Sequence, residues 1–109
     1  MKIIKEVCVD SLEDAVNAEK NGADRIELCR RLDLDGLTPS RNLIEKSFNS
    51  LNIPIRVMIR PKHPSFVYSN EEIYKMLEEI NYCKKVGVDG VVLGCLNNDS
   101  NFNMNQIEF

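Results

Sequence analysis

A chain of 109 residues, with 43% hydrophobic and 28% charged residues, has the composition of one ordinary globular domain. Its formal net charge of −3 gives no general attraction to nucleic acids or to anionic lipids, so we expect neither as a partner. No apolar run approaches the roughly 20 residues of a membrane helix, and the Met1-Lys2 start lacks the apolar core of a signal peptide. We therefore predict a cytoplasmic protein.

The first predicted strand covers residues 3–9 and leads into a helix whose N-cap is Ser11, with Asp14 three residues on. Asn21-Gly22 ends that helix, because glycine tolerates the left-handed conformation at a helix C-terminus. The second predicted strand covers residues 25–29. These segments predict a first β-α-β unit.

A polar loop over residues 30–37 follows, closed by Asp35-Gly36. Thr38 is the predicted N-cap of the second helix and Pro39 its first residue, where the missing N–H of proline costs nothing. The third predicted strand covers residues 55–60. It ends at Arg60-Pro61, since a residue before proline avoids the helical conformation.

Ser69 and Glu72 have the spacing of a capping box, which predicts the start of a third helix after the loop over residues 62–68. Tyr68 and Ile73 have the spacing of a hydrophobic staple. The apolar stripe of this helix includes Cys83, which we interpret as a core residue. A fourth strand over 90–93 and the start of a helix over 104–109 complete the prediction.

The first three strands share one alternation of apolar and polar residues, and successive side chains of a strand point to opposite faces of a sheet. One face therefore receives apolar side chains, namely Val7, Val9, Ile26, Leu28, Ile55, Val57 and Ile59, with Lys5 at the entrance of the first strand as the one exception. The other face receives charged or sulfur-bearing side chains, namely Glu6, Cys8, Asp10, Arg25, Glu27, Cys29, Arg56, Met58 and Arg60.

Strands that alternate with helices predict an α/β fold with a parallel sheet. A polar face fits a (β/α) barrel of the TIM type better than an open sheet covered on both sides, because polar residues can line the barrel interior. A closed barrel takes ~250 residues. We therefore expect residues 1–109 to form a single domain of about four βα units, half a barrel.

Half a barrel leaves its first and fourth strands as unpaired edges, which tend to associate. Two expectations remain open: the chain is the N-terminal fragment of a longer protein, or two copies close a barrel, which would make it a homo-oligomer. A weak internal repeat supports the count of units, since NGAD at 21–24 precedes the second strand and VGVD at 86–89 precedes the fourth.

Several motifs together resemble the N-terminal half of the CutC copper homeostasis family. They are EVCVDS at 6–11, NGADRIELC at 21–29, GLTPS at 36–40, MIRP at 58–61 and Tyr68-Ser69. The resemblance implies a TIM barrel, a cytoplasmic location, assembly into oligomers and a role in copper handling. One departure concerns the loop after MIRP, which in the family reads Arg-Gly-Gly-Asp-Phe and here reads KHPSF at 62–66.

By motif match, the resemblance implies that Cys29 binds copper, with Cys8 as a second matching cysteine. Both residues belong to the polar face of neighbouring strands, which lie ~4.8 Å apart, so both thiols could reach one ion. Met58 on the third strand is a possible third ligand, and thiolate and thioether ligands select Cu(I). The alternative is that all three are adaptable fillers of the barrel interior.

The four cysteines, Cys8, Cys29, Cys83 and Cys95, are widely spaced and include no CxxC, which predicts reduced thiols rather than disulfides or a zinc site. Cys95 follows the fourth strand and could approach the mouth of the barrel, but we interpret it as structural. The one histidine, His63, lies between Lys62 and Pro64 in a loop, where a solvated side chain is the default.

The charged residues of the polar face allow a second function, an enzyme that acts on a small anionic metabolite. Arg60 would bind the anion, and Glu6 or Glu27 would transfer a proton as a general acid or base. The alternative is that these charges only neutralise one another, since unpaired buried ions are costly. A third possibility is a truncated product with no activity of its own.

Overall fold

Strands and helices alternate along the chain in the computed structural model, which describes residues 2–98, 101 and 103. The elements are β1 (Glu6–Val9), α1 (Leu12–Lys20), β2 (Arg25–Leu28), the 3₁₀ helix η1 (Leu32–Leu34), α2 (Arg41–Ser50), β3 (Ile55–Met58), α3 (Asn70–Val86) and β4 (Gly90–Val92). The helix expected over 104–109 lies outside the described residues.

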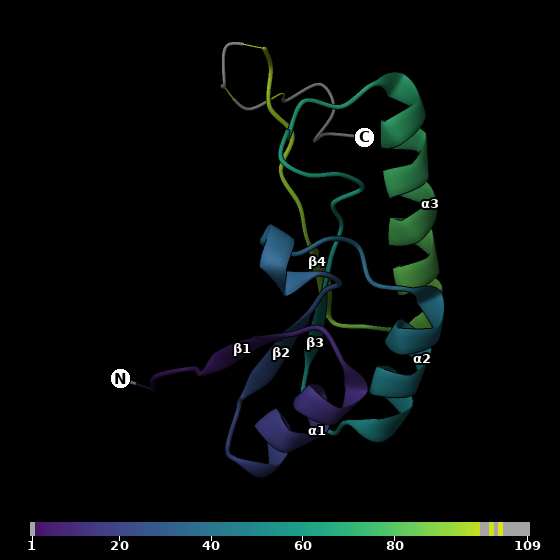
Figure 1. Ribbon diagram of the computed structural model, residues 1–109. Coiled ribbons are helices and arrows are strands. Elements are labelled where there is room, and N and C mark those ends of the chain that lie inside the picture. Colours follow the sequence, from purple (N-terminus) through teal and green to yellow (C-terminus); the bar gives the residue numbers. More distant parts are fainter. Residues whose placement is uncertain (1, 99–100, 102, 104–109) are drawn as a thin grey trace.

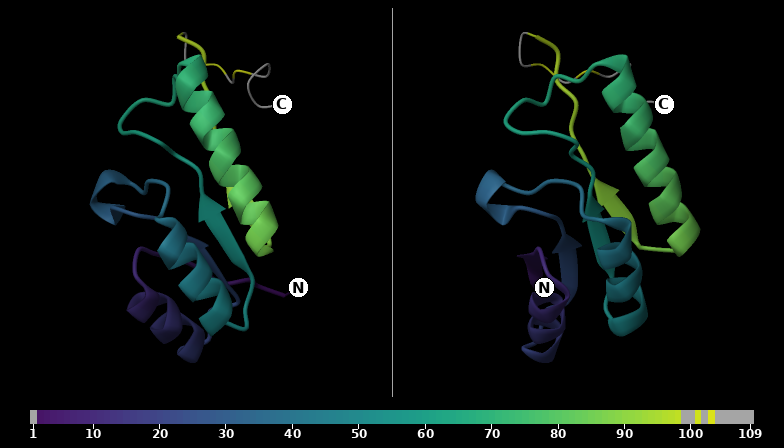
Figure 2. Two further views of the ribbon diagram at one scale, coloured as in Figure 1. Left: turned by 90° about the vertical axis from the view of Figure 1, so that its right-hand side faces the viewer. Right: turned by 45° about the vertical axis from the view of Figure 1, so that its right-hand side comes forward.

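All neighbouring strands of the sheet are parallel, and their order is β1-β2-β3-β4. The helices α1, α2 and α3 lie together on one side of this sheet, as Figures 1 and 2 show. η1 and the long loop between β3 and α3 lie beyond the carboxyl ends of the strands (Figure 1). The predicted α/β class with a parallel sheet is confirmed.

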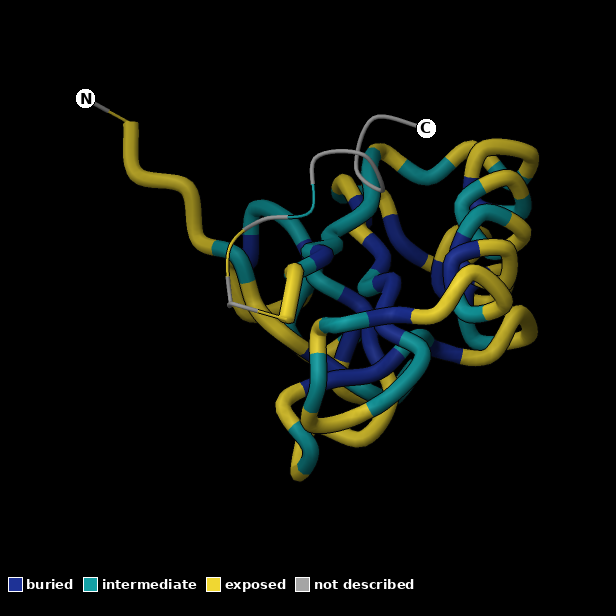
Figure 3. The backbone as a smooth tube through the Cα atoms, turned by 90° about the horizontal axis from the view of Figure 1, so that it is seen from above, coloured by how far each residue is buried: buried dark blue, intermediate teal, exposed yellow. Residues whose placement is uncertain are grey.

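The helix side of the sheet carries the apolar set of side chains. Ile26, Leu28, Ile55 and Val57 are buried there, and Val57 is 0% exposed. Val7 is 37% exposed because it lies on the edge strand β1. Figure 3 shows the buried residues gathered in the middle of the molecule, while residues 2–5 extend away from it in exposed positions.

The strands are shorter than predicted at both ends of the sheet. β1 begins at Glu6, not at residue 3, because Ile3 and Ile4 extend beyond the partner strand; Ile3 is 78% exposed. Past the carboxyl ends, single hydrogen bonds continue the ladder, from Cys29 N to Val9 O (3.0 Å) and from Ile59 N to Val92 O (2.8 Å). The predicted alternation of faces is therefore kept beyond the regular strands.

The N-caps of α1, α2 and α3 are all serines. Ser11 Oγ accepts a hydrogen bond from Asp14 N, and Ser69 and Glu72 form the predicted capping box. The prediction of Thr38 as N-cap and Pro39 as first helical residue is wrong, because Ser40 caps α2 by accepting from Leu43 N.

The Thr38 hydroxyl has a different partner. It accepts a hydrogen bond from Arg60 N at 2.7 Å and so joins the loop before α2 to the end of β3. A hydroxyl committed to a neighbouring strand is not available to a helix terminus, which explains the shift of the cap by two residues.

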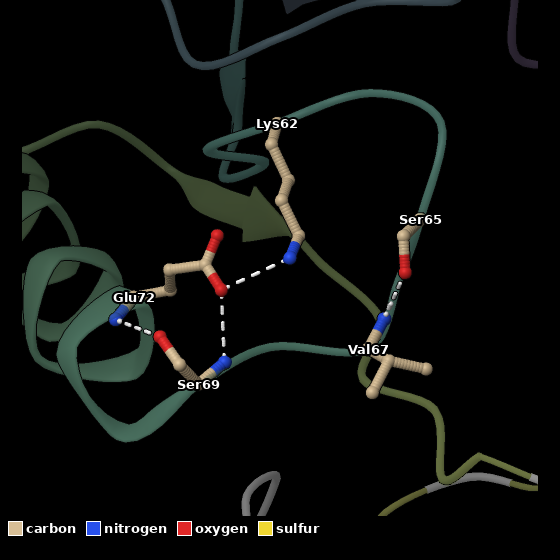
Figure 4. Close-up of polar contacts among 5 residues, drawn as sticks. All are labelled: Lys62, Ser65, Val67, Ser69 and Glu72. Carbon is tan, nitrogen blue, oxygen red and sulfur yellow. Dashed lines mark hydrogen bonds and ion pairs between the residues drawn. The ribbon is translucent and has the colours of Figure 1, made fainter.

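The loop that departs from the CutC motif is fastened to the start of α3. Glu72 Oε1 accepts from Ser69 N (2.8 Å) and pairs with Lys62 Nζ (3.0 Å), while Ser65 Oγ accepts from Val67 N (Figure 4). Tyr68 and Ile73 are both buried, as the predicted staple requires. The loop over 62–68 is thus held in place by its own side chains.

The aspartates of the weak internal repeat, Asp24 and Asp89, have the same structural role. Asp24 Oδ2 accepts from Lys5 N (2.8 Å) ahead of β2, and Asp89 Oδ2 accepts from Ile55 N (2.9 Å) ahead of β4. Each aspartate joins the amino end of its strand to the amino end of a neighbouring strand, at the end of the sheet opposite to the candidate site.

Candidate functional site

The polar side chains of the strands form rows across the sheet face that the helices leave uncovered. The register places Cys8 beside Glu27 and Glu27 beside Arg56. Because Leu28 pairs with Val57, the next row toward the carboxyl ends contains Cys29 and Met58. The three predicted copper ligands therefore lie in two adjacent rows, on three neighbouring strands or their direct extensions.

Cys29 and Met58 meet beneath Gly36. A methyl group placed on Gly36 would lie 3.4 Å from Cys29 Sγ and 3.7 Å from Met58 Cε, so the glycine backbone packs directly against both sulfur-bearing side chains. Gly36 has φ +94°, a conformation that favours glycine. The sequence places Gly36 at the end of a loop and at the start of the GLTPS motif, but neither feature indicates that it packs against Cys29 and Met58.

Both candidate thiols keep their protons at neutral pH. Burial raises the pKa of Cys29 to about 11, and the nearby Asp10, Cys8 and Glu27 act in the same direction. Cys29 is 2% exposed, and its Sγ donates to Val9 O at 3.4 Å. Partial burial, followed by the negative charge of Glu27, raises the pKa of Cys8, which remains exposed. A metal ion would have to displace both protons.

Within the part of the chain that the structure describes, no three His, Cys, Asp or Glu side chains are grouped closely enough to hold a metal ion. The predicted ligands are two cysteines and one methionine, and methionine is not one of these four residue types. The ligand role of Cys8, Cys29 and Met58 therefore stays a prediction. All four cysteines are free, as expected for reduced thiols.

The two carboxylates of the polar face have opposite pKa shifts. Glu6 forms an ion pair with Arg25, and this hydrogen bond lowers the pKa of Glu6. Burial, and then the contact with Glu6, raises the pKa of Glu27. Two carboxyl groups whose environments separate their pKa values are a known basis for acid–base chemistry. The proposed proton transfer by Glu6 or Glu27 nevertheless stays a prediction.

Arg60 is 4% exposed and donates to backbone carbonyls of two loops. Its Nη1 donates to Leu34 O (3.1 Å) and Gly36 O (3.4 Å), and its Nη2 donates to Pro64 O (3.2 Å). Binding of an anion by Arg60, as predicted, would compete with these bonds. That role too stays a prediction.

His63 and Phe66 were not predicted to contact Arg60. His63 Nδ1 lies 3.4 Å from Arg60 Nη2, although the His63 residue is exposed. The Arg60 guanidinium lies over the Phe66 ring, 4.4 Å from its centroid. Neither contact leaves a signal in the sequence, because both depend on how the loop folds back.

The remaining cysteines lie outside this site. Cys83 is buried in α3, and burial raises its pKa to about 11. Cys95 is buried after β4, and burial raises its pKa as well. Both positions fit the structural roles expected of them. Among the described helices, none is long and apolar enough to cross a membrane.

Comparison with known proteins connects this arrangement to one family. Residues 3–109 match the model of the CutC family. The chain is 50% identical over 96 residues to the human copper homeostasis protein cutC homolog, covering 88% of this chain and 35% of that protein. It is 43% identical over 103 residues to a family protein CutC of Vibrio atlanticus, covering 94% of this chain and 42% of that protein.

The fold agrees with a solved structure. The crystal structure of the putative copper homeostasis protein CutC from Streptococcus agalactiae superposes with a TM-score of 0.93 at 34% identity, covering 98% of this chain and 52% of that chain. The predicted TIM-barrel type of fold is thereby confirmed for the strands that this chain contributes. The chain spans about half, or less, of the length of these relatives. On both sequence and structure, the chain belongs to the CutC family.

Proposed function

We propose that this chain takes part in copper homeostasis by binding Cu(I) through Cys29, with Cys8 and Met58 as further ligands. The observation that carries the proposal is the meeting of Cys29 and Met58 beneath Gly36, with Cys8 one row away on the adjacent strand. Two of the relatives described above are named copper homeostasis proteins, and family membership extends that role to this chain as a proposal.

The chemistry of the three side chains favours Cu(I) over harder ions. Thiolate and thioether sulfur select Cu(I), whereas carboxylates and waters suit Mg²⁺ or Ca²⁺. Of the acidic groups nearest the thiols, Asp10 Oδ2 accepts from Leu32 N (3.2 Å), and Glu27 contacts both Glu6 and Cys8. The four free thiols fit a reducing compartment such as the cytoplasm, which we include in the proposal.

We expect Cys29→Ser to weaken Cu(I) binding by more than about 100-fold, a larger loss than removal of a supporting group outside the ligand set causes. Cys8→Ser and Met58→Leu should each weaken binding as well. The measurement is titration of the reduced protein with Cu(I) against a competing chelator. Cys83→Ala is the matched control, because it removes a buried thiol in α3, a helix on the other side of the sheet (Figures 1 and 2), and should leave the affinity unchanged. Unchanged affinity in both Cys8→Ser and Cys29→Ser would remove the proposal.

We further propose that the chain associates through the edges of its sheet. Within the described residues, β1 pairs only with β2 and β4 only with β3. Exposed Ile3, Ile4 and Val7 lie at the β1 edge, where apolar side chains and unpaired backbone groups favour association.

Sedimentation of the 109-residue chain tests this association, and we expect species larger than a monomer. Replacing Ile4 and Val7 by lysine should shift the population toward monomer, since edge charges oppose strand pairing. A wild-type chain that sediments as a well-behaved monomer would contradict the proposal.

A further inference from the structure

The segment over residues 30–38 passes over the candidate copper site, and we call it the covering segment. We propose that the covering segment must move aside before a metal ion reaches Cys29, and that Arg60 is the positioning residue that holds the segment closed. The part that concerns copper rests on the proposed function; the part that concerns access to Cys29 does not.

Arg60 contacts the covering segment with both its side chain and its backbone. Nη1 donates to the carbonyls of Leu34 (3.1 Å) and Gly36 (3.4 Å), the second of which belongs to the residue packed on Cys29. Arg60 N donates to Thr38 Oγ1 (2.7 Å), and Thr38 N donates to Arg60 O (3.0 Å). One residue just after β3 thus fixes the carboxyl-terminal half of the segment.

The guanidinium is itself fixed from the opposite side. Nη2 donates to Pro64 O (3.2 Å), and the plane of the group lies over Phe66. Among the described residues, Arg60 forms no ion pair with a carboxylate. A buried guanidinium whose two Nη atoms donate to carbonyls of two separate loops joins those loops. Loss of Arg60 would release the covering segment from the loop over 62–68.

The covering segment has a backbone that needs such external support. Arg31 (φ 54°) and Asp35 (φ 63°) both adopt the left-handed conformation, which is unfavourable for residues with a side chain. Strained positions of this kind persist only where surrounding contacts determine them. Besides Arg60, the described contacts that hold the segment include the bond from Leu32 N to Asp10 Oδ2. Removing the Arg60 contacts should therefore favour an open segment.

When the covering segment is closed, the thiols of Cys8 and Cys29 differ in their access to solvent. Cys8 is exposed, while Cys29 is almost fully buried beneath Gly36. With the segment closed, solvent reaches Cys8 and not Cys29. The covering segment must therefore open before any reagent or ion can contact Cys29.

Alkylation of individual cysteines by N-ethylmaleimide, followed by mass spectrometry, tests the inference without copper. Cys83 is an internal reference, because Cys29 and Cys83 are both buried, at 2% and 1% exposure. A change of their rate ratio between variants therefore reports local opening around Cys29, because general loosening of the fold would raise both rates. We expect Arg60→Met to raise the Cys29-to-Cys83 ratio about tenfold or more.

Arg56→Met is the matched control, since Arg56 lies on the same face of β3 and is exposed. It should leave the ratio within about twofold of wild type. Two milder variants guard against a failure of Arg60→Met to fold. Arg60→Lys keeps the charge without the fork, and Thr38→Val removes the hydroxyl that accepts from Arg60 N. Each should raise the ratio by about threefold.

An unchanged ratio in Arg60→Lys and Thr38→Val would overturn the inference. So would a parallel rise of Cys29 and Cys83, because it would indicate general loosening rather than movement of one segment. A parallel Cu(I) titration separates the two proposals. If the ratio rises in a protein that binds no Cu(I), the inference about the covering segment holds and the proposed copper function is wrong. If the protein binds Cu(I) but the ratio does not change, the copper function holds and the inference about the covering segment is wrong.

Discussion

We expect the Cu(I) affinity of the reduced protein to rise about a hundredfold for each unit of pH between about pH 6 and 8. Burial raises the pKa of Cys29 to about 11, and the pKa of Cys8 also lies above its ordinary value of 9.0. Both thiols are therefore protonated throughout this range. Binding as thiolates releases two protons, so the affinity falls with the square of the proton concentration. Chelator competition at three pH values measures the slope.

Single cysteine substitutions provide a control for this dependence of Cu(I) affinity on pH. In Cys8→Ser and in Cys29→Ser only one thiol proton remains to be displaced, and the rise should shrink to about tenfold per pH unit. Cys83→Ala should keep the wild-type slope, because Cys83 lies in α3 and takes no part in the site. A wild-type affinity that does not change with pH would show that the two thiols do not bind copper as thiolates.

We expect Val57→Ala to lower the free energy of unfolding by about 2–3 kcal/mol. Val57 is fully buried on the central strand β3, on the side covered by helices, so its methyl groups lose apolar contacts and leave a cavity. Such a loss is a large part of the stability of a small domain. Urea denaturation measures the change, provided that the denaturant slope stays constant.

Val7→Ala makes the same chemical change on the same face of the edge strand. Because Val7 is more than a third exposed, the loss should stay below about 1 kcal/mol. If both variants lost equal stability, the edge strand and the inner strand of this face would not differ in burial as described. Association through the β1 edge would add to the effect of Val7→Ala, so both variants are compared at low protein concentration.

Local sequence patterns were sufficient to predict the secondary-structure elements and to assign side chains to the two faces of the sheet. The strict alternation through β2 and β3 assigned Ile26 and Val57 to the buried side, and the structure agrees. The spacing of Ser69 and Glu72 located the start of α3. Thr38 shows the limit of the same reasoning: its type and position suit an N-cap, but its hydroxyl bonds to Arg60, which is distant in sequence.

The sequence alone determined which side chains share the open face of the sheet, because alternation along a strand and capping of a helix act within a few residues. Only the tertiary structure decided how those side chains are used. It placed Gly36 against Cys29 and Met58, engaged Arg60 with the carbonyls of two loops, and raised the pKa of Cys29 through burial. These outcomes depend on where loops return to the sheet, a matter of packing between distant segments that no local pattern records.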